Sequence, residues 1–195
     1  MAYETVVIAP KFQSESFINF YTQENSDFIL KTANETIKLY KLTVEPWKLV
    51  FTGRNSTNQI TRYFGINKLG SMSFHKTATT QRTEYYALQS IKFIEQAIKS
   101  ATKIYSHFGF FGDLILGLTL DISKNLSLIL SDYKLYEKYE YKNNSIRISR
   151  NLSYDDLSNP QKILQEILQE LIAYFGLILP EKDVIQLIAK TIQTA

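Results

Sequence analysis

The feature of this chain that most constrains its fold is a long amphipathic segment at 84–108, which lies between two stretches with the alternating pattern of β-hairpins. Apolar residues recur there at steps of three and four and fall on one stripe of a helix. The stripe consists of Leu88, Ile91, Ile94, Ile98, Ala101, Tyr105 and Phe108. Full burial of a large apolar side chain contributes about 1.5–3 kcal/mol, so such a helix persists where its stripe packs against another layer. The sequence therefore predicts a helix over 84–108 on a β-sheet, with Gly109 as the residue that ends it.

Runs of β-branched and alternating residues predict the strands of that sheet. These runs lie at 4–9, 47–52, 60–66, 71–76 and 145–150. Residues 67–70 (NKLG) have the composition of a turn and join two of the runs into a predicted hairpin. Runs at 113–122 and 126–130 predict a second hairpin, and the apolar spacing near 14–21 predicts a short helix.

The last part of the chain is predicted to be a helical hairpin. Asn159 and Pro160 suit the start of its first helix, and Gly176 suits the end of that helix. We expect an α+β fold, in which a mostly antiparallel sheet carries a long central helix and a C-terminal helical hairpin packed against it. The expected division is an α+β domain at 1–158 and a helical hairpin at 159–195 that packs on the same domain.

Composition excludes several classes of protein. The chain has no cysteine, which excludes a disulfide scaffold, a thiolate nucleophile and any zinc or iron–sulfur site that uses cysteine. Its N-terminus lacks the pattern of a signal peptide, and its longest apolar runs are far shorter than the ~20 residues of a membrane span. We therefore expect a cytoplasmic protein that has no contact with a membrane.

No motif of a known catalytic mechanism occurs in the sequence. The phosphate-binding patterns GxGxxG and GxxxxGK[ST] and the nucleophile pattern GxSxG are absent. His75 and His107 are not spaced as a pair of metal ligands, and Glu95 is best explained as a partner of Lys99 one helical turn later. We expect no catalytic residue, no metal and no cofactor, and hence a protein that is not an enzyme.

Nucleic-acid binding is the alternative that the cationic residues favour. Arg62, Arg147 and Arg150 fall on predicted strands, and aromatic residues follow the first of them. A sheet of this kind can stack single-stranded bases, while Lys99 and Lys103 on the helix are placed to contact phosphates. The other interpretation is that these arginines and lysines form ordinary solvated faces.

The final helix carries more apolar residues than one contact with the preceding helix covers. Ile185, Ile188 and Ile192 are its candidate partner-binding residues, because apolar surface left exposed usually marks a site of association. The alternative is that both C-terminal helices pack onto the sheet and leave no such surface.

One stretch resembles a known protein family. The segment RYFGINKLGSMSF at 62–74 is followed at 84–122 by EYYALQSIKFIEQAIKSATKIYSHFGFFGDLILGLTLDI. This order of hairpin, helix and strand, over roughly 45–150, resembles the C-terminal region of bacterial Schlafen-type proteins whose N-terminal half is an AlbA-like ATP- or DNA-binding domain. Nothing in the sequence corresponds to the AlbA-like half, so no functional residue is transferred. The resemblance implies a bacterial accessory or sensing module, which we expect to act through protein contacts and to self-associate as a dimer.

Overall fold

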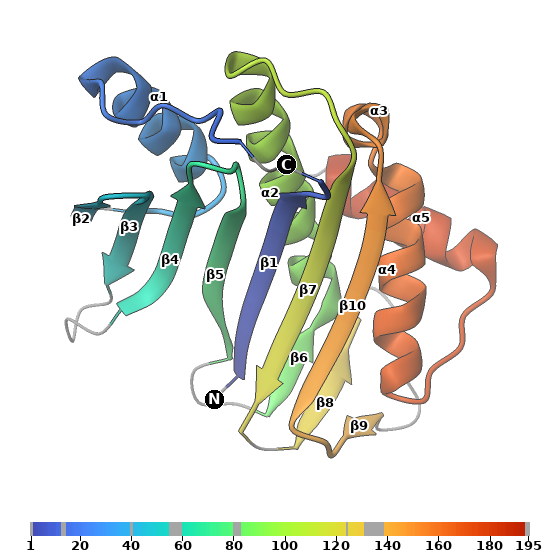
Figure 1. Ribbon diagram of the computed structural model, residues 1–195. Helices are drawn as coiled ribbons and strands as arrows, with labels where there is room; N and C mark the ends of the chain where they lie inside the picture. The colour runs from blue at the N-terminus through green and yellow to red at the C-terminus, as the bar shows by residue number, and fades with distance from the viewer. Residues whose placement is uncertain are drawn as a thin grey trace.

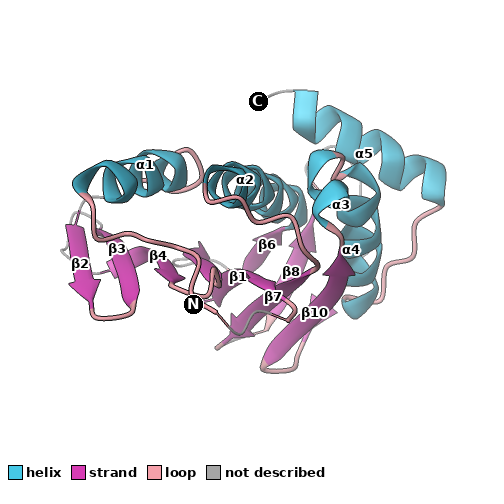
Figure 2. Ribbon diagram, turned by 45° about the horizontal axis from the view of Figure 1, so that its top comes forward, coloured by secondary structure: helices cyan, strands magenta, loops and turns pink. Residues whose placement is uncertain are grey.

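An antiparallel sheet of seven strands with helices on one of its faces forms the body of the protein (Figures 1 and 2). The computed structural model describes residues 2–12, 15–39, 41–54, 60–79, 83–123, 125–130 and 139–193. From one edge to the other, the strands are β10 (Ser145–Leu152), β7 (Leu114–Ile122), β1 (Ala2–Pro10), β5 (Met72–Thr79), β4 (Ile60–Asn67), β3 (Lys48–Arg54) and β2 (Lys41–Glu45). The expected α+β class is confirmed.

The helices and a small second sheet complete the fold. The helices are α1 (Gln23–Asn34), α2 (Ala87–His107), α3 (Tyr154–Ser158), α4 (Gln161–Tyr174) and α5 (Glu181–Gln193). The second sheet joins β6 (Glu84–Tyr86) in parallel to β8 (Leu126–Ile129), which pairs antiparallel with β9 (Glu140–Tyr141). Among the described residues, none of the helices combines the length and the apolar character needed to cross a bilayer.

Period-two alternation gives the large sheet one covered face and one open face. In β1, Val6 and Ile8 are fully buried beneath the helices, whereas Thr5 and Val7 point to the opposite face and are partly exposed. The same alternation holds in β7 and β10, where Ile146 is buried and Arg147 is exposed. Figure 2 shows all the labelled helices on the same side of this sheet.

The long helix carries its apolar stripe against the covered face, as predicted. Ile91, Ile94 and Ile98 are fully buried, and Gly109 follows the helix with a φ of 73°. The predicted start is wrong by three residues, because 84–86 form β6 instead of the first turn of the helix. The aromatic ring of Tyr85 is buried there and stacks on Phe175, which favours an extended backbone over a helical one.

Two other local predictions are also wrong. The runs 113–122 and 126–130 do not form a hairpin, because β7 lies between β1 and β10 while β8 pairs in the second sheet. β1 offers β7 a register of nine residue pairs, which a hairpin with the short β8 cannot match. The described residues 15–21 form no helix, since the first helix begins only after Thr22, whose side chain accepts a hydrogen bond from the Asn25 amide.

Two glycines share a backbone conformation but differ in how tightly their surroundings are packed, and one of them lies in the turn between β4 and β5. Gly70 and Gly176 both have a φ of 83°. A Cβ added at Gly70 would overlap the ring of Phe17, whereas one added at Gly176 would meet nothing within 4 Å. The Phe17 ring cannot move aside freely, because it stacks on Phe110 with ring centroids 5.0 Å apart.

We predict that Gly70→Ala lowers the free energy of unfolding by about 1–3 kcal/mol more than Gly176→Ala does, because both variants share the cost of a positive φ and only the first is overpacked. Denaturant unfolding of the two variants measures the difference. Equal losses in both would show that the contact with Phe17 does not constrain the turn.

Candidate anion-binding site

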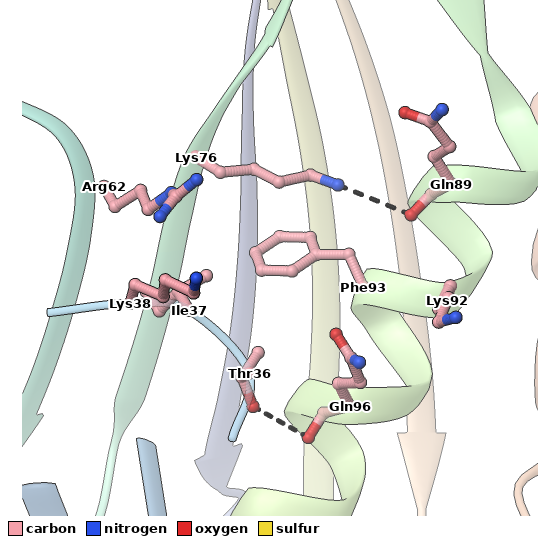
Figure 3. A pocket seen from close by; sticks show the side chains of 9 residues that line it. All are labelled: Thr36, Ile37, Lys38, Arg62, Lys76, Gln89, Lys92, Phe93 and Gln96. Carbon is pink, nitrogen blue, oxygen red and sulfur yellow. Dashed lines mark hydrogen bonds between the residues drawn. The ribbon is translucent and has the colours of Figure 1, made fainter. Parts of the chain in front are cut away.

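A cavity of about 360 Å³ opens between α2, the segment that follows α1, and the covered face of β4 and β5 (Figure 3). Four cationic side chains, two glutamine amides and one threonine hydroxyl line it, together with two apolar side chains. The four cations are Lys38, Arg62, Lys76 and Lys92, and each comes from a different element or loop. This set of residues is called the cationic pocket below.

Strand alternation places two of the cations on the covered face. Phe64 and Ile66 of β4 are buried under the helices, and Arg62 continues the same face toward the end of the strand. Lys76 of β5 continues the face of Phe74 and is the register partner of Arg62. Like charges directly opposite each other on neighbouring strands are destabilising, so this pair has an electrostatic cost that a negative charge nearby must offset.

A buried carboxylate holds Lys76 in place. The Lys76 ammonium lies 3.3 Å from Oε2 of Glu4, 3.4 Å from the carbonyl oxygen of Gln89 and 4.3 Å from the centroid of the Phe93 ring. Glu4 is fully buried on β1, and its Oε2 also accepts a hydrogen bond of 3.1 Å from Ser90. The charge of Lys76 is therefore neutralised by Glu4, which lies on the neighbouring strand β1.

The polar cluster beneath the pocket is incompletely bonded. Oε1 of Glu4 is buried without a hydrogen-bond partner among the described residues, and the buried hydroxyl of Tyr85 lies near Ser90 but forms no hydrogen bond of good geometry. Burial raises the pKa of the Tyr85 hydroxyl well above its usual value, and the charge of Glu4 raises it further. The tyrosine therefore stays neutral and adds no second negative charge beside Glu4, whose charge the Lys76 ammonium balances at 3.3 Å.

The other three cations of the pocket have no acidic neighbour of this kind. Lys38 and Arg62 are exposed and Lys92 is half-buried, and none of them forms an ion pair in the part of the chain that the structure describes. Figure 3 shows Lys38 and Arg62 together on one side of the cavity, with Lys92 on α2 across from them. The pocket thus has an excess of positive charge, which attracts an anion.

The five cations predicted from the sequence to bind nucleic acid do not lie on one surface in the structure. Arg62 lines the cationic pocket, whereas Arg147 lies on the opposite, open face of the sheet. Arg150 is on the covered face, where two glutamates of α4 bind its guanidinium, the nearer at 2.6 Å. Lys99 pairs with Glu95 at 2.6 Å, as expected from their spacing, and Lys103 pairs with Glu35 at 2.5 Å.

The three isoleucines proposed for partner binding are also separated by burial. Ile188 is 1% exposed, because it packs in the core that α5 shares with the rest of the protein, and Ile192 packs against the same core. Ile185 is 41% exposed. Of the three, Ile185 is the residue that the fold leaves at the surface.

Sequence reasoning identified Arg62 but missed Lys38 and Lys76 as members of the same site. Lys76 could have been found from the sequence, because it lies two residues after Phe74 and therefore on the same face of its strand. Arg62 lies two residues before Phe64 and shares the face of that residue on the neighbouring strand. The turn between the two strands fixes their register and places Arg62 opposite Lys76. Two cations on the same face as buried apolar residues predict that this face is positively charged at one end of the strands.

Comparison with known protein families, with curated proteins and with solved structures gives no match. Among the described residues, no group of three or more histidine or acidic side chains is placed to hold a metal ion.

The open face of the sheet carries a histidine with a perturbed pKa. Nδ1 of His75 lies 2.9 Å from the hydroxyl of Thr5, and its ring stacks on Tyr3. Burial lowers the pKa of His75 from the usual 6.5, and the charge of Asp121 opposes that effect. We predict that the His75 resonances titrate with a midpoint below 6.5 in an NMR pH series.

The unfolded chain then takes up this proton first, so the contribution of His75 to stability is full above a pH of about 6.5 and is lost as the pH falls toward the folded value. A midpoint at or above 6.5 would contradict the expectation.

Stability measurements can also separate the roles of the two opposed cations. We predict that Lys76→Met lowers the free energy of unfolding by about 3–5 kcal/mol, because it leaves the Glu4 carboxylate buried and unpaired. The matched variant Arg62→Met should leave stability unchanged or raise it by up to about 1 kcal/mol, because it removes a like-charge contact. Adding Glu4→Gln to Lys76→Met should recover most of the loss, and equal losses in both single variants would refute this division of roles.

Proposed function

We propose that the protein is a non-enzymatic binding module whose cationic pocket takes a small ligand with a phosphate group. The observation that carries the proposal is the convergence of four cations from separate segments on one cavity, with one carboxylate that neutralises one of them. Bringing Arg62 and Lys76 into register costs stability, and a bound anion would compensate for that cost.

The side chains of the pocket suit a phosphate. The guanidinium of Arg62 can donate two parallel hydrogen bonds to anionic oxygens, and lysine ammonium groups act as mobile point charges beside it. Gln89 and Gln96 supply amides at the rim, and Phe93 supplies an apolar wall. A volume of about 360 Å³ lies at the small end of ligand pockets, which favours a compact ligand.

Nucleic-acid binding is the weaker candidate, because a strand requires cations that follow its backbone. Three of the five predicted cations, Arg150, Lys99 and Lys103, are engaged in ion pairs. The remaining two, Arg62 and Arg147, lie on opposite faces of the sheet. This placement favours a single concave site over an extended track.

Protein contacts remain part of the proposal. The resemblance to the accessory region of bacterial Schlafen-type proteins suggests a module that senses a ligand and passes its state to a protein partner. The exposed side chain of Ile185 on α5 is available for such a contact.

Calorimetric titration with inorganic pyrophosphate and with a nucleoside monophosphate tests the proposal. We predict saturable binding at low salt, and a loss of about tenfold or more in affinity in Arg62→Ala and in Lys92→Ala, because each removes a charge-assisted hydrogen bond or a close charge. Arg147→Ala makes an equivalent charge change outside the pocket and should bind as the wild type does.

The same titration separates the alternatives. Absence of binding to either anion at low salt would refute the anion site. Tighter binding of a labelled single-stranded oligonucleotide, weakened by Arg147→Ala, would replace it with the nucleic-acid function.

A further inference from the structure

The strand β2 forms an edge of the large sheet, and no described strand pairs with its outer side. Figures 1 and 2 both show β2 as the outermost strand, with α1 over one face of this end of the sheet and not along its outer edge. An edge of this kind presents unpaired backbone amide and carbonyl groups to any strand that approaches it.

The register of the β2–β3 hairpin identifies which backbone groups face outward. Glu45 and Lys48 close the hairpin around the two-residue turn Pro46-Trp47, and such a closing pair is a hydrogen-bonded one. Hydrogen-bonded pairs alternate along an antiparallel ladder, so the backbone groups of Leu42 and Val44 point away from β3.

The outward edge is also apolar on the covered face of the sheet. Leu42 and Val44 are the register partners of the buried Phe51 and Leu49, yet they are 40% and 53% exposed. Trp47 in the adjoining turn is 64% exposed. Apolar side chains of this size at a strand edge are favoured where another strand covers them.

The sequence of β2, Lys41-Leu42-Thr43-Val44-Glu45, is complementary to itself in an antiparallel arrangement. A two-fold axis at Thr43 gives the register Lys41–Glu45 and Leu42–Val44 between the two copies, so residues of opposite charge occupy paired positions at both ends and apolar residues occupy those between them. The pairs formed by Leu42 and Val44 are the ones whose backbone groups face outward, so this register also satisfies the edge.

We propose that two copies of this chain associate through β2 and form one continuous antiparallel sheet with the helices of both copies on the same face. The other edge of the sheet does not offer this fit, because β10 carries Arg147 and Arg150 and no acidic residue. The proposal is independent of the cationic pocket and of any ligand. An edge of five residues gives a small interface, so we expect a weak dimer with a dissociation constant in the micromolar range.

Sedimentation velocity over about 1–300 µM protein tests the dimer in that range. We expect the wild type to dimerise, and Glu45→Lys and Lys41→Glu each to weaken the dimer at least tenfold, because each puts like charges opposite each other at both ends. An equimolar mixture of the two variants should dimerise again, since every pair across the interface is then of opposite charge. Glu181→Lys makes the same charge change on α5 and should leave the dimer intact.

The equimolar mixture distinguishes loss of the interface from loss of folding. Glu45→Lys also puts a lysine opposite Lys48 within its own hairpin, and mixing two variants does not repair a hairpin that has lost its structure. A wild type that stays monomeric across the range overturns the proposal. It is equally overturned if both single variants dimerise as strongly as the wild type, which would place the interface elsewhere.

Discussion

The apolar stripe of α2 packs on β1 and β5 of the large sheet, and other sides of the same helix contact α1, α3, α4 and α5. Each of these contacts buries apolar side chains that would otherwise face water, at about 25 cal/mol for each Å² removed from solvent. Because α2 contacts both the sheet and the other four helices, α1 and the C-terminal helices share one hydrophobic core with the strands. Loss of the α2 stripe would therefore weaken the packing of several elements at once, while α3 and α4 would keep their direct contacts with β10.

The cationic pocket is a consequence of the way α1 and α2 cover the sheet. β4 and β5 continue past the area that the two helices fill, so the covered face becomes accessible where Arg62 and Lys76 lie. Side chains in phase with a buried stripe are thereby held on rigid strands, and α2 contributes Lys92 and Gln96 from the opposite wall. Strands and a helix fix the backbone positions from which Arg62, Lys76 and Lys92 extend before any ligand arrives, which reduces the entropy lost on binding.

Those parts of the fold that depend on local pattern could be predicted from the sequence. The stripe of α2 follows from helical spacing, and the β4–β5 hairpin follows from the turn residues between its strands. The partner of β7 could not be predicted, because β1 lies more than a hundred residues earlier in the chain and nothing in either strand specifies the other. The residues of the cationic pocket likewise fall into those that the sequence could predict and those that it could not. Arg62 and Lys76 follow from strand phase, whereas Lys38 joins them through the path of an irregular segment after α1 that no periodicity describes.

The position of β1 between β5 and β7 has a kinetic consequence. A first strand at the centre of a sheet pairs with segments that leave the ribosome much later, and the second of these ends at Ile122. Closing such long loops loses chain entropy before any strand pairing compensates for it, which makes folding slow compared with that of a protein rich in local contacts. During synthesis β1 is therefore made before both of the strands that pair with it, so each of its edges can pair wrongly until β5 and then β7 are complete.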